Sequence, residues 1–195
     1  EDTTLVVVGD VDQLPSIGPG NVLRDMIDSR RFDTIRLTEI FRQAQESRIV
    51  RCAHLVNTGK MPFTDNDACG NFFFIRRRNP QEIPETIVDM VARRLPSKYG
   101  FDPIEDIQVI SPMHKSDTGV ANLNAMLQER LNPPGPGKHE IARGYWTYRL
   151  GDKVMQIRNN YDKNVFNGDI GRIVHINSKN GVLKIFVPKR EEDKP

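Results

Sequence analysis

The chain has few of the residues that build disulfide frameworks or metal sites. Cys52 and Cys69 are its only cysteines among 195 residues, and its four histidines are scattered. Two thiols cannot make a disulfide framework, and no Cys or His spacing matches a zinc quartet. We therefore expect two reduced cysteines, no metal ligands and a cytoplasmic protein.

Long apolar runs are also missing. The longest, residues 5–8 and 72–75, contain four residues each, whereas a membrane-spanning helix needs about 20. The first residues lack the charged-then-apolar pattern of a secretion signal. No membrane partner is expected.

Charge of one sign does not dominate either. Lys and Arg number 28 against 26 Asp and Glu, for a net charge of +2, so the whole-chain charge neither demands nor excludes a polyanionic partner. Hydrophobic residues make up 37% of the chain and charged residues 28%. This composition is that of a folded chain rather than a disordered one.

Two patterns divide the chain. Up to about residue 132, short apolar runs alternate with helical periodicity, which predicts an α/β fold with a mostly parallel sheet and flanking helices. The expected strands are 5–8, 34–37, 72–75 and 107–110, and the expected helices lie around 49–56, 84–95 and 120–131. The segment 133–137 (PPGPG) marks a boundary. Beyond it, Asn167-Gly168 and Asn180-Gly181 favour hairpin turns between β-formers, so residues 137–195 are predicted to form a small antiparallel β-barrel.

The most informative motif follows the first expected strand. Residues 5–8 lead into Gly9-Asp10, which places Asp10, Asp12 and Gln13 at the carboxyl end of a strand. Open α/β sheets bind ligands at this edge. By composition alone, a polar turn that merely leaves a core strand explains the same residues.

The wider string GDVDQLPSIGPGNVLRDMI, residues 9–27, closely resembles motif III of superfamily-one helicases of the RecD-like branch. Three further segments resemble that family in the required order: 37–59 its motif IV, 109–124 a later DNA-contacting motif, and 151–171 its inserted barrel. The resemblance implies parts of RecA-like P-loop NTPase motor domains plus a barrel similar to Src-homology-three barrels. It also implies a superfamily-one B helicase that moves 5′ to 3′ along single-stranded DNA with ATP and Mg²⁺.

The resemblance further implies a division of the chain. Residues 1–33 would end the first RecA-like motor domain, 34–136 would begin the second, and 137–195 would be the inserted barrel. No G-x-x-x-x-G-K-[ST] segment occurs, and no Asp-Glu follows a strand. We therefore expect an internal fragment that binds neither ATP nor Mg²⁺ by itself, does not hydrolyse ATP, and needs the remaining motor segments as partners. Its open sheet edges predict pairing between copies of the chain.

Roles for the catalytic candidates follow from the resemblance. Gln13 would sense the γ-phosphate, and Arg42 would be an arginine finger whose planar fork binds two phosphate oxygens. A surface salt bridge from Arg42 to Glu39 or Glu46 is the alternative. Asp10 would either order the loop around water and metal or merely cap the turn.

Candidate DNA contacts fall in two stretches. The loop after residue 110 leads into a helix whose first amides we expect to be unpaired and able to seat a DNA phosphate. The alternative is that Ser116, Asp117 and Thr118 only cap that helix. In the barrel, basic residues outnumber acids between 138 and 172, and aromatics are interleaved among them. This pattern suits base stacking, although such aromatics are often core and the asparagines could simply hold turns. The predicted contacts are Ser111, Pro112, His114, Lys115, Thr118, Gly119, Asn124, Asn159, Asn160, Tyr161 and Asn167.

Two other functions remain open at this point. The chain could serve only as a DNA-binding module through these two stretches. It could also be the helicase part of an exodeoxyribonuclease V alpha subunit, with a role in DNA repair and recombination, or of a conjugative relaxase, because both share these motifs.

Overall fold

The computed structural model describes residues 3–13, 18–37, 46–66 and 70–188. The chain divides into two compact units, Glu1–Arg76 and Arg77–Pro195, and each is described by itself. The boundaries predicted at 33/34 and 136/137 stay predictions, and the 133–137 segment lies inside the second unit. Within the described ranges, no helix combines the length and apolar character needed to span a membrane.

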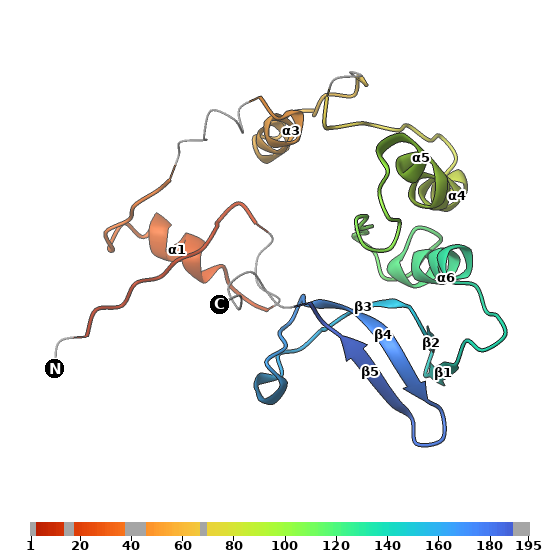
Figure 1. The fold of residues 1–195 in the computed structure, drawn as a ribbon. Coiled ribbons are helices and arrows are strands. Elements are labelled where there is room, and N and C mark those ends of the chain that lie inside the picture. Colours follow the sequence, from red (N-terminus) through yellow and green to blue (C-terminus); the bar gives the residue numbers. More distant parts are fainter. Residues whose placement is uncertain (1–2, 14–17, 38–45, 67–69, 189–195) are drawn as a thin grey trace. The chain divides into compact units, whose positions relative to one another are not determined.

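The first unit contains α1 (Val22–Asp28) and α3 (Arg48–Asn57) (Figure 1). α3 begins at Ser47, whose hydroxyl accepts from the Val50 amide, and it is followed by Gly59 with a φ of 73°. The sequence prediction of a helix here is confirmed. Arg48 of α3 forms a bidentate pair with the Asp65 carboxylate at 2.9 and 3.2 Å, and this hydrogen bonding lowers the pKa of Asp65.

The predicted parallel sheet is not formed by the described residues. Segments 5–8, 34–37, 72–75 and 107–110 have no strand pairing, and Val8, Leu37 and Ile110 are about nine-tenths exposed. A parallel strand needs hydrogen-bonded neighbours and helices over both faces. The described part of each unit supplies neither for these runs, so they do not form strands there.

The second unit begins with a continuous helical stretch. Its parts are α4 (Glu82–Asp89), the π-helical turn η1 (Met90–Arg94) and α5 (Leu95–Tyr99). The π turn ends at Arg94, two residues before Pro96, which lacks the amide that an α-helical bond would need. Gly100, with a φ of 74°, ends the stretch in the left-handed conformation.

A longer helix, α6 (Val120–Leu131), packs against α4 and η1. Val91 of η1 and Leu123 of α6 are both buried. The predicted helices around 84–95 and 120–131 are therefore confirmed, and their apolar stripes form this part of the core.

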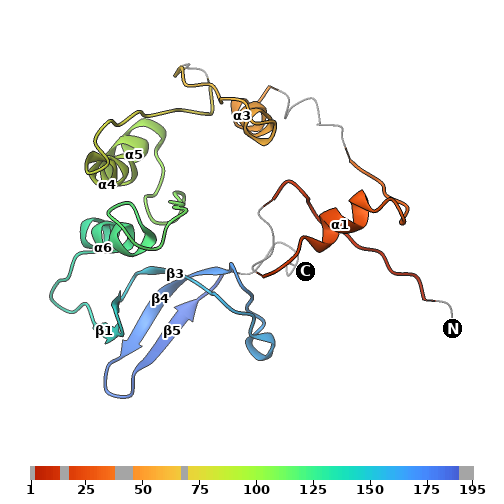
Figure 2. The same cartoon turned by 180° about the vertical axis from the view of Figure 1, so that it is seen from behind.

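The strands that follow α6 are antiparallel, as predicted. β1 (Glu140–Arg143) pairs with β2 (Trp146–Arg149), and a three-stranded sheet has the order β3 (Lys153–Met155), β4 (Ile170–Asn177), β5 (Val182–Phe186). β4 and β5 form a long hairpin beside β3 in both views (Figure 2). Asn180-Gly181 lies in its turn, where Gly181 has a φ of 67°, so this hairpin prediction is confirmed. Asn167-Gly168 instead ends a longer loop between β3 and β4.

The core of the sheet centres on β4. Ile173 is 1% exposed and Ile176 is 4% exposed. Gly171 faces β5 so closely that an added Cβ would lie 2.7 Å from the Phe186 carbonyl oxygen. The sheet therefore depends on a few well-packed positions.

Replacing Ile173 with Ala should lower the free energy of unfolding by about 2–5 kcal/mol, because it leaves a cavity in a buried site. Val174 is the next residue on the same strand and is 53% exposed, so Val174→Ala is the matched control. Urea unfolding followed by circular dichroism measures both. Equal losses in the two variants would contradict the assignment of Ile173 to the core.

Candidate nucleic-acid interface

The helix-start loop, residues 111–119, folds back onto the first turn of α6. The Ser111 hydroxyl donates to the Thr118 carbonyl at 2.7 Å. The Val120 amide donates to the Met113 carbonyl at 2.8 Å, and the Ala121 amide donates to the His114 carbonyl at 3.4 Å. The expectation that the first amides of α6 are unpaired is therefore wrong for these two, because the loop itself supplies their acceptors.

The capping alternative is not realised either. Gly119 is the N-cap residue, and no side chain makes a capping hydrogen bond to α6. The Ser116 and Thr118 hydroxyls lie 3.5 Å apart, and the Asp117 carbonyl accepts from the Asn122 amide group at 2.6 Å. These side chains therefore stabilise the loop rather than the helix end.

Several predicted contacts in this stretch are accessible to a ligand. Pro112, His114 and Lys115 are exposed, and Asn124 is exposed on α6, whereas Thr118 is half-buried and Gly119 is buried. An anion at this loop would consequently meet the His114 and Lys115 side chains rather than the helix amides.

The second candidate surface is the barrel loop, residues 156–169, which joins β3 to β4. Gln156 extends the ladder: its amide donates to the Asp169 carbonyl and its carbonyl accepts from the Gly168 amide, both at 2.8 Å. Farther out, Asn160 and Val165 exchange backbone bonds of 2.7 and 3.1 Å around the 3-10 turn η2 (Tyr161–Lys163). The loop is thus an ordered projection of the sheet.

Asparagine side chains hold this loop together. Asn160 Oδ1 accepts from the Lys163 amide at 3.1 Å, and Asn159 Oδ1 accepts from the Asn167 amide at 2.9 Å. Asn159 Nδ2 donates to the Tyr161 hydroxyl at 3.2 Å. The turn-holding alternative therefore accounts for Asn159 and Asn160, whose side-chain oxygens are engaged within the loop.

Tyr161 offers the loop's accessible aromatic ring. It is 76% exposed and rests edge-on against Phe166, with ring centroids 5.9 Å apart at 82°. Arg158 and Lys163 are exposed in the same loop. Both belong to the basic surplus between residues 138 and 172, although neither is among the predicted contacts.

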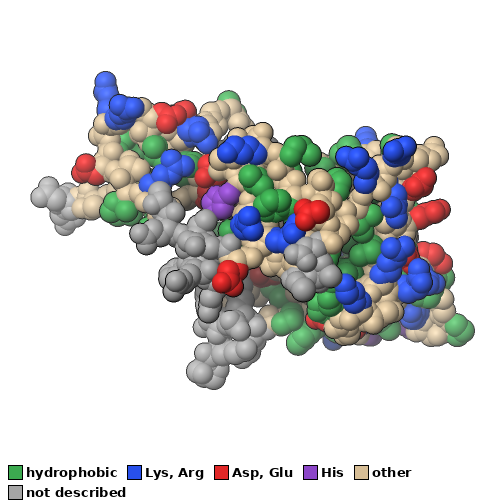
Figure 3. Space-filling model, turned by 90° about the horizontal axis from the view of Figure 1, so that it is seen from above, with side chains coloured by type: hydrophobic (Ala, Val, Ile, Leu, Met, Phe, Trp, Pro, Cys, Tyr) green, Lys and Arg blue, Asp and Glu red, His purple; other side chains and the backbone are tan. Residues whose placement is uncertain are grey.

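Charge is mixed on the face drawn in Figure 3. Lys and Arg side chains are interspersed there with Asp and Glu rather than gathered into one patch. Binding of a polyanion would therefore rest on individually placed groups.

The nucleotide candidates Asp10 and Gln13 lie together in a turn of the first unit. Asp10 Oδ1 accepts from the Asp12 amide at 2.9 Å, and Asp10 Oδ2 accepts from Gln13 Nε2 at 3.1 Å. Both side chains are exposed. Asp10 thus caps the turn, and the Gln13 carboxamide is accessible for a phosphate contact.

The partner expected across the nucleotide lies outside the described residues. Arg42 and its alternative partner Glu39 both fall there, so a meeting of Gln13 and Arg42 at one phosphate stays a prediction. Within the described residues, no group of three or more Asp, Glu, His or Cys side chains is arranged to hold a metal ion. Gln13 Nε2 carries two hydrogens and donates one of them to Asp10, which leaves the other for an oxygen acceptor.

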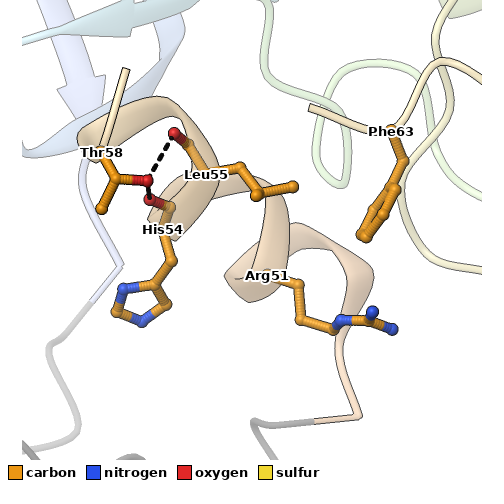
Figure 4. A pocket seen from close by; sticks show the side chains of 5 residues that line it. All are labelled: Arg51, His54, Leu55, Thr58 and Phe63. Carbon is orange, nitrogen blue, oxygen red and sulfur yellow. Dashed lines mark hydrogen bonds between the residues drawn. The ribbon is translucent and has the colours of Figure 1, made fainter. Parts of the chain in front are cut away.

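A shallow hollow lies on α3 (Figure 4). It is lined by Arg51, His54, Leu55, Thr58 and Phe63. Leu55 and Phe63 point toward one another, and the Arg51 guanidinium lies 4.8 Å from the centre of the Phe63 ring. Arg48 lies 5.0 Å from the same ring, so these cations stabilise the position of Phe63.

Comparison with known proteins identifies the chain's relatives. Residues 123–186 match the family model described as the ATP-dependent RecD-like DNA helicase SH3 domain, and residues 1–71 match a model described as an AAA domain. The ATP-dependent RecD2 DNA helicase of Deinococcus radiodurans is 34% identical over 171 residues, which cover 87% of this chain and 22% of the relative. The chain belongs to the RecD-like helicase family. It spans about a fifth of the length of this relative.

The SH3 match of this RecD-like chain begins inside α6, at residue 123. It covers β1 to β5 and the whole barrel loop. The family unit therefore joins α6 to the antiparallel strands, across the PPGPG segment that suggested a boundary.

A substitution at Gly119 tests whether the helix-start loop packs closely on α6. An added Cβ would lie 2.7 Å from the Lys115 carbonyl carbon and 2.9 Å from that of His114. Gly119→Ala should push the loop off α6, cost about 1–3 kcal/mol of stability, and speed hydrogen exchange at the Val120 and Ala121 amides. Gly135 has no atom within 4 Å of such a Cβ and provides the control. Unchanged exchange in Gly119→Ala would contradict this packing.

Proposed function

We propose that the whole protein is a superfamily-one B DNA helicase, driven by ATP and Mg²⁺, that moves 5′ to 3′ along single-stranded DNA. This chain supplies part of the strand grip and the γ-phosphate-sensing Gln13 and Arg42. Support comes from the RecD-like SH3 match, the AAA match and the RecD2 relative, each covering part of the chain.

The barrel loop carries the DNA-binding part of the proposal. Its backbone and asparagine bonds shape the loop around the exposed Tyr161, and the same loop contains the exposed Arg158 and Lys163. A pre-organised ring loses little conformational entropy when a base stacks on it. Stacking on such a ring contributes about 1–3 kcal/mol per base and tolerates any sequence, which suits a translocating enzyme.

The helix-start loop supplies the second contact. His114 and Lys115 would meet backbone phosphates, with Ser111, Pro112 and Asn124 nearby in the chain and Thr118 and Gly119 shaping the loop. Phosphate contacts of this kind position a strand without selecting its sequence. In the barrel loop, Asn159, Asn160 and Asn167 make hydrogen bonds that shape the backbone around Tyr161.

The nucleotide part of the proposal rests on Gln13. Its exposed carboxamide would contact the γ-phosphate, Asp10 would order the loop, and Arg42 would neutralise charge that develops during phosphoryl transfer. The chain contains no G-x-x-x-x-G-K-[ST] segment. It is therefore expected to hydrolyse no ATP by itself.

Binding of a fluorescein-labelled oligothymidylate of about 15 nucleotides, followed by fluorescence anisotropy, tests the strand grip in the 195-residue chain. Affinity should fall as salt rises, with a slope of about −0.7 per phosphate contact. Tyr161→Ala should weaken binding by about 5- to 150-fold through lost stacking. Lys163→Ala should flatten the salt slope by about 0.7.

Tyr99 provides the aromatic control, because it stacks on Phe101 in a different part of the second unit. Tyr99→Ala should bind the oligonucleotide as the wild type does. Salt-independent binding, no binding, or equal effects of the two tyrosine substitutions would each overturn the proposed grip.

Arg42→Ala in the whole protein tests the phosphate contact. Because the arginine meets charge that develops in the transition state, turnover of ATP should fall by about 10³-fold or more while nucleotide affinity changes little. Steady-state hydrolysis and equilibrium binding of a nucleotide measure the two effects. Arg78→Ala, at an exposed arginine, is the control. Equal losses of turnover and affinity would indicate a structural arginine instead.

A further inference from the structure

The Asp152 carboxylate gathers donors from two parts of the second unit. Asp152 Oδ2 accepts from Gln128 Nε2 and from the Arg149 amide, both at 2.6 Å. Asp152 Oδ1 accepts from Asn132 Nδ2 at 2.7 Å. Gln128 belongs to α6 and Asn132 ends it, whereas Asp152 and Arg149 lie where β2 passes to β3. The carboxylate thus ties the helix to the strands.

Neighbouring bonds reinforce this tie. Gln128 also donates to the Thr147 carbonyl at 2.8 Å, and Asn132 also donates to the Leu150 carbonyl at 3.1 Å. The buried Arg149 guanidinium donates to the Asn132 carbonyl at 2.5 Å. Because nearly every group in this cluster has a partner inside the cluster, α6 cannot shift along the strands without breaking several bonds together.

The other end of the helix-start loop is tied to the same strands. Lys153 Nζ donates to the Ile107 carbonyl at 3.1 Å, and Arg172 pairs with Glu105 at 3.0 Å. Lys153 and Arg172 are register partners on β3 and β4. The helix-start loop is therefore anchored to the sheet both before residue 111 and after residue 119.

The same strands carry the barrel loop. β3 runs only from Lys153 to Met155 before the loop begins at Gln156, and the Asp152 carbonyl accepts from the Ile173 amide of β4 at 2.9 Å. β3 lies between α6 and the barrel loop (Figure 1). Asp152 and Lys153 stand at the start of this strand. Neither side chain belongs to either surface.

We propose that Asp152, with Lys153, is a positioning residue that holds the helix-start loop and the barrel loop at a fixed spacing, so that both bind one DNA strand at once. This inference rests on the proposed function. Two weak contacts on a rigid frame act at high effective concentration toward each other, and their combined affinity is lost when the frame loosens.

The test compares Asp152→Asn with wild type in the 195-residue chain, using labelled oligothymidylates of about 15 and about 4 nucleotides. The Asn side chain keeps the size of Asp152 but replaces one carboxylate oxygen with an NH₂ group, so at least one of the three donors loses its acceptor. Binding of the longer probe should weaken about tenfold or more, because avidity is lost. The shorter probe reaches one loop only, so its affinity should stay the same.

Gln128→Ala provides a second, milder variant, because it removes the bonds to Asp152 and Thr147 and leaves Asp152 and its other donors in place. It should show the same length-selective loss, and it decides the question if thermal melting shows Asp152→Asn to be unfolded. Asp89→Asn is the matched control, since Asp89 pairs with the exposed Arg93 and Arg94 on its own helical stretch. It should bind both probes as the wild type does.

The outcomes separate the two proposals. Failure of the wild-type chain to bind the longer probe in a salt-dependent way overturns the proposed function itself. If the wild type binds but folded variants at Asp152 and Gln128 keep full affinity for the longer probe, or lose both probes equally, the positioning role is wrong.

Discussion

The second unit is organised around one half-buried carboxylate. Asp152 accepts from Gln128, Asn132 and the Arg149 amide, and this polar cluster sets where α6 meets the strands. The apolar core beside it is small, with Ile173 and Ile176 as its buried residues on β4. Apolar packing is non-directional, whereas hydrogen bonds specify a geometry. The hydrogen bonds of the carboxylate therefore specify how α6 is oriented against the β2–β3 connection, and the apolar core adds stability without direction.

Both candidate surfaces are loops held by their own hydrogen bonds. The helix-start loop uses the Val120 and Ala121 amides for its own fold, and the barrel loop uses Asn159 and Asn160. These amides and side-chain oxygens, which the sequence suggested as DNA contacts, instead make hydrogen bonds within the loops. The shape in turn presents the remaining accessible groups, chiefly Lys115, Lys163 and Tyr161, at defined places on a rigid frame.

The first unit presents a different situation. The Asp10 and Gln13 pair is exposed, and the apolar run 5–8 just before it is exposed as well. Phosphoryl transfer requires several groups converging on one phosphate. Besides the Asp10 carboxylate and the Gln13 carboxamide, two arginines reach this turn: Arg24 donates to the Val11 carbonyl at 3.0 Å, and Arg36 lies 3.8 Å from the Asp12 carboxylate. The chemistry assigned to Gln13 still depends on groups beyond this turn.

Local signals in the sequence determined three helical regions and one hairpin, whereas α1 was not predicted. Ser47 and Gly59 bound α3, Gly100 ends α5, and Asn180-Gly181 turns β4 into β5, because caps and turns depend on residues a few positions apart. Only the tertiary structure decided that the four apolar runs stay unpaired among the described residues, that the Val120 and Ala121 amides have acceptors, and that Asp152 accepts from α6. These depend on partners distant in the chain, such as Gln128 for Asp152 and Ile107 for Lys153, whose approach no local pattern encodes.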